Sequence, residues 1–337
     1  MSYRAIVVDT APATEDASED ALRAVVRELT EAAVPLHDGV RIDVSHSSVN
    51  YKDAIALTGG PGILRTTPMV PGIDAVGTLV DRAGALSAGA LVTLNGAGLG
   101  ERTDGGLAES VLAPASAVVA VPSAFTAREA AAIGTAGFTA ALSVLALQRH
   151  GVAPEAGDVL VTGAGGGVGS FAIALLASLG YRVVASTARV ESRGPALTDL
   201  GAAEILDRAT LAEAGKPLQK GRWAAVVDSV GGVPLANALA QTSSGGVVTA
   251  AGLAADLKLP TTVLPFILRA VTLVGINSVE ASPADRAEAW TLLAAQLDSQ
   301  AIADIAPRTV PLAEAPSVGA EVLAGTVAGR VVVDVRA

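Results

Sequence analysis

The segment SSVNYKDAIALTGG, residues 47 to 60, contains the side chains best suited to proton chemistry. The chain has three tyrosines, and one of them, Tyr51, stands between Asn50 and the charged pair Lys52 and Asp53. A phenol is protonated at neutral pH, so it can donate a hydrogen bond or a proton to a developing oxyanion. The alternative is a packed tyrosine whose hydroxyl is bonded to a backbone carbonyl. The residues alone leave both interpretations of Tyr51 open.

A glycine cluster in VLVTGAGGGVGSFAIALLASLG is the second chemical motif. A strand pattern leads into Gly163-x-x-Gly166-x-x-Gly169, and a helix pattern follows directly. Glycines allow a tight turn and the close approach of a pyrophosphate, whose negative charge is favoured at a helix N-terminus. The placement of the cluster between a strand and a helix predicts a dinucleotide site. Its predicted contacts are Gly163, Gly166, Gly167, Val168 and Gly169.

The end of the next strand predicts which nicotinamide cofactor binds. NAD sites usually place an Asp or Glu there to accept a hydrogen bond from the ribose 2′-hydroxyl. Here the chain reads Ser186-Thr187-Ala188-Arg189. Two hydroxyls and an arginine suit a 2′-phosphate, which a carboxylate would repel, so Ser186, Thr187 and Arg189 predict NADPH. The alternative for Arg189 is a solvated loop residue.

The elements around these motifs change character after Pro122. Short β-branched runs punctuated by Gly and Pro come before it and predict a compact, barrel-like β-rich domain. Apolar strands alternating with helices come after it and predict a doubly wound parallel sheet. The first of these helices begins with a capping box, Thr126 and Glu129. The last strands resemble those of the first third, so we expect one discontinuous domain, 1–124 and 301–337, around a second domain, 125–300.

Composition narrows the class of function. The 337 residues carry a net charge of −10, which argues against nucleic acid as a partner because phosphate binding needs a basic surface. There is no cysteine, and the three histidines, His37, His46 and His150, lack ligand-like spacing, so no metal site is predicted. The N-terminus lacks a signal-peptide pattern. Residues 130–148 are uncharged, but their Gly and Thr content favours a buried helix over a membrane span. We therefore expect a cytoplasmic protein without a membrane partner.

Several segments together resemble one family. NYKDA, PMVPGIDAVGTLV, GGLAE, IGTAGFTA, VTGAGGGVGS, VVDSVGG, LPTTVLPFILR and INSV are similar to the zinc-independent branch of the medium-chain dehydrogenase/reductases. Within this branch the chain resembles the acrylyl-CoA reductase and quinone oxidoreductase subgroup. The resemblance runs from about Tyr3 to the last strand, and it implies a GroES-like β-rich catalytic domain plus a Rossmann domain. The absence of cysteine fits the metal-free branch.

The resemblance implies NADPH-dependent reduction of the C=C bond of a short α,β-unsaturated acyl-CoA thioester. The alternative is reduction of a quinone or enone, and a non-enzymatic nicotinamide-binding protein is a third class. Tyr51 would act beside the nicotinamide, and Asn50 would hold the cofactor ribose or carboxamide. Asp53 is expected to cap a helix or to pair with Lys52 or an arginine, and Asp74 to fix a turn. Further contacts implied for the cofactor are Thr135, Thr139, Gly252, Leu253, Asn277 and Ser278.

Arg65 and Arg269 are the candidates for contact with a coenzyme A phosphate, the alternative for each being an exposed arginine. Residues 101–104 read ERTD, where the subgroup is expected to carry an Asn-His-Trp-like stretch. This departure leaves the identity of the acyl group open. The resemblance, together with an apolar candidate edge strand at residues 270–278, also implies a homodimer.

Overall fold

The computed structural model describes residues 2–10, 22–30 and 39–337, so His37 lies outside the described residues. The chain divides into two compact units. The first unit comprises Met1–Thr135, Ser278–Trp290 and Ala306–Ala337, and the second comprises Ala136–Asn277 and Thr291–Ile305. The domain boundaries expected at residues 124 and 300 stay a proposal.

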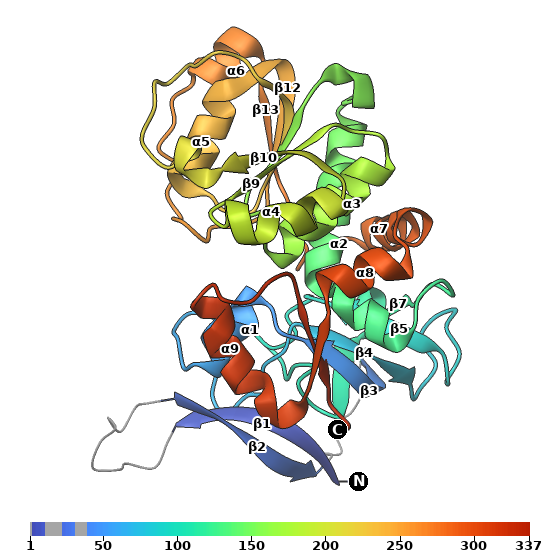
Figure 1. The fold of residues 1–337 in the computed structure, drawn as a ribbon. Coiled ribbons are helices and arrows are strands. Elements are labelled where there is room, and N and C mark those ends of the chain that lie inside the picture. Colours follow the sequence, from blue (N-terminus) through green and yellow to red (C-terminus); the bar gives the residue numbers. More distant parts are fainter. Residues whose placement is uncertain (1, 11–21, 31–38) are drawn as a thin grey trace, which may run out of the picture. The chain divides into compact units, whose positions relative to one another are not determined.

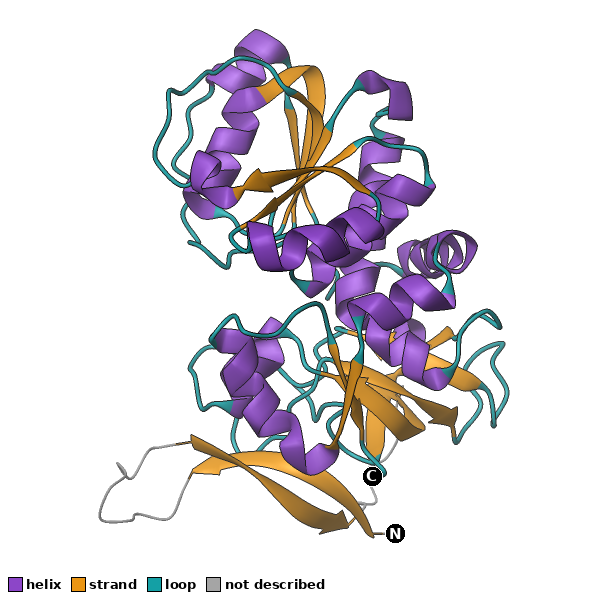
Figure 2. Ribbon diagram, in the orientation of Figure 1, coloured by secondary structure: helices purple, strands orange, loops and turns teal. Residues whose placement is uncertain are grey.

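The first unit is built on a seven-stranded, mainly antiparallel sheet (Figures 1 and 2). Its strand order is β14-β15-β3-β4-β5-β7, and β6 also pairs with β3. Because β15 pairs antiparallel with β3, the last strand of the chain completes a sheet formed by the first third. The strands are β3 (Gly39–Ser48), β4 (Asp74–Leu79), β5 (Leu91–Asn95), β6 (Ser110–Pro114), β7 (Val119–Ala120), β14 (Arg308–Pro311) and β15 (Val331–Asp334).

A separate two-stranded sheet in this unit pairs β1 (Ser2–Thr10) with β2 (Leu22–Thr30). The sequence analysis did not predict β2. The reason is physical: β2 is mostly exposed and carries Arg23, Arg27 and Glu28, so it lacks the apolar alternation of a strand that packs on a core. Backbone pairing with β1 over all nine residues defines it instead.

The second unit contains a six-stranded parallel sheet with the order β10-β9-β8-β11-β12-β13. Figure 1 shows α3 and α5 on opposite faces of this sheet. Strands β9 and β11 are buried along their whole length, as expected where helices cover both faces. The predicted doubly wound parallel sheet is confirmed. Its strands are β8 (Val159–Val161), β9 (Val183–Thr187), β10 (Ala202–Asp207), β11 (Trp223–Asp228), β12 (Thr242–Ala250) and β13 (Thr272–Gly275).

Helix α2 (Ala127–Arg149) begins with the predicted capping box, because Thr126 N donates to Glu129 Oε2 at 2.8 Å and Glu129 N to Thr126 Oγ1 at 3.2 Å. It is long and apolar enough to cross a membrane, but 89% of its most apolar window is buried. The helix is broken at Gly134, whose φ of 46° and ψ of −157° are not helical.

The other α-helices include three short ones, α6, α8 and α9, that the sequence analysis did not predict. They span six to nine residues and show at most two turns of apolar periodicity. The bounds are α1 (Tyr51–Leu57), α3 (Gly167–Ser178), α4 (Val190–Asp199), α5 (Gly232–Gln241), α6 (Leu264–Arg269), α7 (Pro283–Gln296), α8 (Ser299–Ile305) and α9 (Ala315–Leu323).

Candidate active site

The glycine turn lies between β8 and α3, at the carboxyl end of a central strand of the parallel sheet. Open α/β sheets bind ligands at this end, where the strand order reverses. Gly163 has a φ of 61°, which favours glycine. A Cβ built on Gly166 would have only the Gly163 carbonyl oxygen within 4 Å, at 3.4 Å, whereas one on Gly169 would lie 2.4 Å from that oxygen. Gly163 therefore allows the turn, Gly166 leaves the start of α3 open, and Gly169 allows the helix to pack closely on the turn.

Neighbouring strand ends hold this turn in place. Ala164 N donates to the Ser186 carbonyl at 3.1 Å, which ties the turn to the end of β9. On the other side, the Asp228 carboxylate accepts from Thr162 Oγ1 at 2.6 Å and from Gly231 N at 2.8 Å. Burial raises the pKa of Asp228, and these donors oppose the rise. The turn is thus a preorganised backbone cradle that fits a pyrophosphate.

Two of the three predicted 2′-phosphate contacts, Thr187 and Arg189, converge beside Gly165. A Cβ placed on this glycine would lie 3.5 Å from Arg189 Nη2, 3.7 Å from Thr187 Oγ1 and 4.0 Å from Arg193 Nε. Ser186 and Thr187 are buried at the end of β9, and Thr187 Oγ1 accepts from Arg189 N at 3.1 Å. The sequence analysis did not identify Arg193, although its position four residues after Arg189 in a helical segment was a usable signal.

The remaining predicted cofactor residues of the second unit lie at other strand ends or in helices. Gly252 and Leu253 follow β12, and a Cβ on Gly252 would lie 2.1 Å from the Ser229 carbonyl oxygen, so only glycine fits. Leu253 is 63% exposed, and Asn277 follows β13 and is exposed. Gly167 and Val168 form the first turn of α3, whereas Thr139 is buried within α2. Their contacts with a cofactor stay predictions.

Tyr51 is the first residue of α1 and is 49% exposed. Its hydroxyl makes no hydrogen bond to any residue in the described ranges. The packed alternative, with the hydroxyl on a backbone carbonyl, is therefore not found. Tyr181 shows what that alternative looks like, because its buried hydroxyl donates to the Val152 carbonyl at 2.7 Å. The proton-donor role of Tyr51 stays a prediction.

Asp53 caps the N-terminus of α1, the helix that begins with Tyr51. Asn50 N donates to Asp53 Oδ2 at 2.8 Å, and Ile73 N donates to Asp53 Oδ1 at 2.9 Å. The expected capping role of Asp53 is confirmed, but Lys52 pairs with Glu101 at 2.6 Å. Burial, reinforced by the charge of Asp74, raises the pKa of Asp53 to about 7, although the N–H donors oppose the rise.

Asp74 does more than fix a turn. Its fully buried carboxylate accepts six hydrogen bonds and forms an ion pair with Arg330 at 3.3 Å. Arg330 Nη1 in turn donates to Asn50 Oδ1 at 2.7 Å, and Asn50 Nδ2 donates to both Asp53 and Asp74. The donors to Asp74 are Ser48 Oγ, Asn50 Nδ2, Asn95 Nδ2, Thr135 N, Thr135 Oγ1 and Arg330 Nη2.

This Asp74 network occupies two side chains that were predicted to bind the cofactor. The Asn50 amide already uses both its oxygen and its NH₂ group on protein partners, and Thr135 Oγ1 donates to Asp74 at 2.7 Å. The kink beside Thr135 needs Gly134, because a Cβ there would lie 2.5 Å from Asp74 Oδ2 and from Arg330 Nη2. In this structure Asn50 and Thr135 are positioning groups, and their contacts with a cofactor stay predictions.

The ERTD loop is fixed by side-chain contacts on both sides. Glu101 pairs with Lys52, the neighbour of Tyr51, and Arg102 pairs with Glu280 at 2.8 Å. Asp104 Oδ1 accepts from Val70 N at 2.9 Å. The loop is therefore a polar, anchored neighbour of the Tyr51 helix.

The arginines predicted to meet coenzyme A differ from each other. Arg65 is exposed, and its side chain has no hydrogen-bond or ion-pair partner in the described part of the chain, which leaves it able to meet an anion. Arg269 Nη1 donates to the carbonyls of Ala240 and Thr242 at 3.0 and 2.9 Å, and Nη2 donates to the carbonyl of Gln219. Arg269 is thus neither exposed nor unpartnered, and these bonds leave it little capacity for a phosphate.

Ser278, the last predicted cofactor contact, accepts from Arg286 Nη2 through its carbonyl at 3.4 Å.

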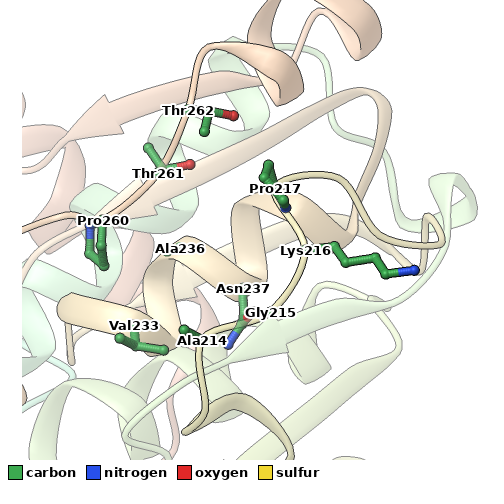
Figure 3. Close-up of a pocket in the computed structure, with 10 residues that line it drawn as sticks. All are labelled: Ala214, Gly215, Lys216, Pro217, Val233, Ala236, Asn237, Pro260, Thr261 and Thr262. Atoms are coloured by element: carbon green, nitrogen blue, oxygen red, sulfur yellow. The ribbon is translucent and has the colours of Figure 1, made fainter.

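A cavity of about 70 Å³ beside α5 contains none of the predicted site residues. Figure 3 shows that the Lys216 side chain extends away from it. Sites for drug-sized ligands usually measure about 300 Å³ or more, so this cavity is too small for a dinucleotide. Among residues 2–10, 22–30 and 39–337, no group of three or more His, Asp or Glu side chains is placed to hold a metal ion.

Two family descriptions match the chain. Residues 37–123 match the alcohol dehydrogenase GroES-like domain, and residues 167–295 match the family described as zinc-binding dehydrogenase. The probable acrylyl-CoA reductase AcuI of Escherichia coli is 47% identical over 314 residues, which cover 93% of this chain and 96% of the relative. The "Putative quinone oxidoreductase YhfP" of Bacillus subtilis is 42% identical over 298 residues, with coverage of 88% and 90%.

Solved structures agree with these matches. The YhdH oxidoreductase of Salmonella enterica in complex with NADP superposes with a TM-score of 0.92 at 44% identity, over 98% of this chain and 99% of that one. Bacillus subtilis YhfP with NAD bound also gives a TM-score of 0.92, at 38% identity, over 99% and 100%. The two structures therefore share one fold and hold different nicotinamide cofactors.

Proposed function

Because the chain belongs to the zinc-independent branch of the medium-chain dehydrogenase/reductases, a family of oxidoreductases, we propose that it uses NADPH to reduce the C=C bond of a short α,β-unsaturated acyl-CoA thioester. The observation that carries the proposal is the glycine turn with donors converging above Gly165. The domains proposed for this activity are 1–124 with 301–337 and 125–300, and the proposed location is the cytoplasm.

The residues around the turn fit NADPH. Gly166 leaves the start of α3 open to the pyrophosphate, while Gly163 allows the turn and Gly169 its close packing. The end of β9 presents Thr187 and Arg189, where an NAD site would present a carboxylate. Bound there, the cofactor would supply a hydride.

The other requirement of this reaction is stabilisation of an oxyanion. When a hydride adds to the β-carbon of the thioester, negative charge develops on the carbonyl oxygen, and a proton must then reach the α-carbon. Tyr51 supports this step because its hydroxyl is exposed and unbonded within the described ranges. Asn50 and Asp53 position it by fixing the start of α1.

Reduction of a free quinone or enone is the second candidate function. The similarity to YhfP favours it. The same hydride step would then serve an uncharged acceptor, and Arg65 would have no substrate role.

We also propose that the protein is a homodimer. Strand β13 is the last in its sheet order, and the segment before it exposes Leu257, Ile267 and Leu268 at 79%, 67% and 61%. An apolar edge of this kind is usually covered. Light scattering should give twice the 33.3 kDa chain mass, and a monomer would contradict this proposal.

The deciding experiment follows NADPH oxidation by absorbance with acrylyl-CoA, crotonyl-CoA and a simple quinone in parallel. We expect fast turnover of a thioester and slow turnover of the quinone, and the two thioesters rank the acyl chain length. Fast turnover of the quinone alone would select the second candidate. Tight NADPH binding without oxidation by any acceptor would contradict both.

A further inference from the structure

Two arginines, Arg189 and Arg193, stand one helical turn apart at the start of α4. Arg189 occupies the position before the helix, and Arg193 N donates to the Arg189 carbonyl at 2.8 Å. The two guanidinium groups are neighbours, because Arg189 Nη2 and Arg193 Nε both lie within 4.0 Å of the point where a Cβ would stand on Gly165.

This arrangement is electrostatically unfavourable without an anion. Like charges at this spacing repel each other, and the start of a helix carries partial positive charge that disfavours cations. Burial, followed by the charge of Arg189, lowers the pKa of Arg193. In addition, Arg193 Nε is buried without a hydrogen-bond partner in the described part of the chain. Buried donors are normally satisfied, so Arg193 needs a ligand to complete it.

The space that such a ligand would fill lies above Gly165. Arg189 Nη2, Thr187 Oγ1 and Arg193 Nε all come within 4.0 Å of the point where a Cβ would stand on this glycine. Any side chain at position 165 would enter this space. Guanidinium groups match the planar, multidentate geometry of phosphate oxygens, and a hydroxyl adds a further donor.

We propose that Arg193 acts with Arg189 as a two-guanidinium clamp for the phosphate monoester on the adenosine ribose of NADPH, and that Arg193 thereby determines the preference for NADPH over NADH. This inference rests on the proposed use of NADPH. It makes Arg193 a determinant of cofactor specificity, and it gives the buried Arg193 Nε a hydrogen-bond acceptor on the phosphate.

The test measures binding rather than turnover. Isothermal titration calorimetry gives Kd values for NADPH, NADH, adenosine 2′,5′-bisphosphate and inorganic phosphate, with the wild type, Arg193→Gln and Arg182→Gln. Arg182 is the matched control, because it precedes β9 at the opposite end of the strand and pairs with Asp158 at 2.6 Å.

Arg193→Gln should weaken binding of NADPH and of the bisphosphate about 10- to 100-fold, as expected for one hydrogen bond to a charged group. Its Kd for NADH should stay within about threefold, and Arg182→Gln should bind all ligands like the wild type. Without ligand, Arg193→Gln should melt at the same temperature as the wild type or higher, because it removes a like-charge contact.

Three results would overturn the clamp: unchanged NADPH affinity in Arg193→Gln, an equal loss for NADH and NADPH, or inorganic phosphate binding as tightly as the bisphosphate. Failure of the proposed function looks different. In that case the wild type itself would bind NADPH no more tightly than NADH, before any variant is considered.

Discussion

The Asp74 network in the first unit and the half-buried arginine pair in the second unit differ in the charges that they bring together. Asp74 accepts six hydrogen bonds and pairs with Arg330, so its charge is compensated by the protein. Arg189 and Arg193 place two like charges together, and Arg193 Nε has no partner among the described residues. A carboxylate with a full set of donors fixes backbone geometry, whereas a buried guanidinium nitrogen without a partner in the described ranges indicates where an acceptor of opposite charge belongs.

The largest expected effect is on stability and comes from removing Asp74 from its network. Asp74→Ala should lower the free energy of unfolding by about 3–5 kcal/mol, because it leaves the buried Arg330 guanidinium without its counter-charge. Urea denaturation measures this change. In contrast, Glu280→Gln removes the exposed partner of Arg102 and should change stability by less than about 1 kcal/mol. Similar values for the two variants would show that the Asp74 network does not hold the fold.

Tyr51→Phe tests whether the network positions a reactive group. Loss of the hydroxyl should reduce turnover of a thioester about 100-fold or more, with the Kd for NADPH nearly unchanged. Steady-state kinetics and calorimetry give the two quantities. Tyr181→Phe is the matched control, because the Tyr181 hydroxyl is bonded to a backbone carbonyl and its loss should affect stability rather than turnover. Wild-type turnover in Tyr51→Phe would rule out the donor role.

Two glycine variants separate the packing role of Gly169 from the cofactor-binding role proposed for Gly166. Gly169→Ala should lower the free energy of unfolding by about 1–3 kcal/mol, because its Cβ would lie 2.4 Å from the Gly163 carbonyl oxygen. Gly166→Ala meets only that oxygen, at 3.4 Å, so it should unfold like the wild type and bind NADPH more weakly. Thermal denaturation and calorimetry separate these outcomes. Normal NADPH binding by Gly166→Ala would place the pyrophosphate elsewhere.

The most gradual effect is a pH dependence that comes from Asp53 and is spread over about three pH units. Its pKa is raised to about 7 from an ordinary value of 3.8, so the folded state keeps a proton between pH 4 and 7 that the unfolded state releases. The stabilisation is complete below about pH 4 and is lost as the pH rises to about 7, by at most about 1.4 kcal/mol per pH unit. Urea titrations at several pH values should show a flatter profile for Asp53→Asn. Parallel profiles would mean that Asp53 stays ionised.

How far the sequence predicts the structure depends on the range of the contacts. The glycine turn, the end of β9 and the capping box of α2 follow from neighbouring residues, because helix starts and strand-to-helix turns are local. Strand β2 was missed, since only pairing with β1 defines it. The contacts of Lys52 were also unpredictable, because Glu101 is 49 residues away along the chain.

The sequence by itself determined the oxidoreductase family, the doubly wound sheet and the position of the dinucleotide turn. Tertiary structure decided what the side chains do. It placed Asp74 against Arg330, a partner 256 residues distant, and so converted Asn50 and Thr135 into positioning groups. It also gave Arg269 three carbonyl partners and left Arg193 Nε with none among the described residues. Burial and long-range contacts set these roles, and neither can be read from residues that are adjacent in the chain.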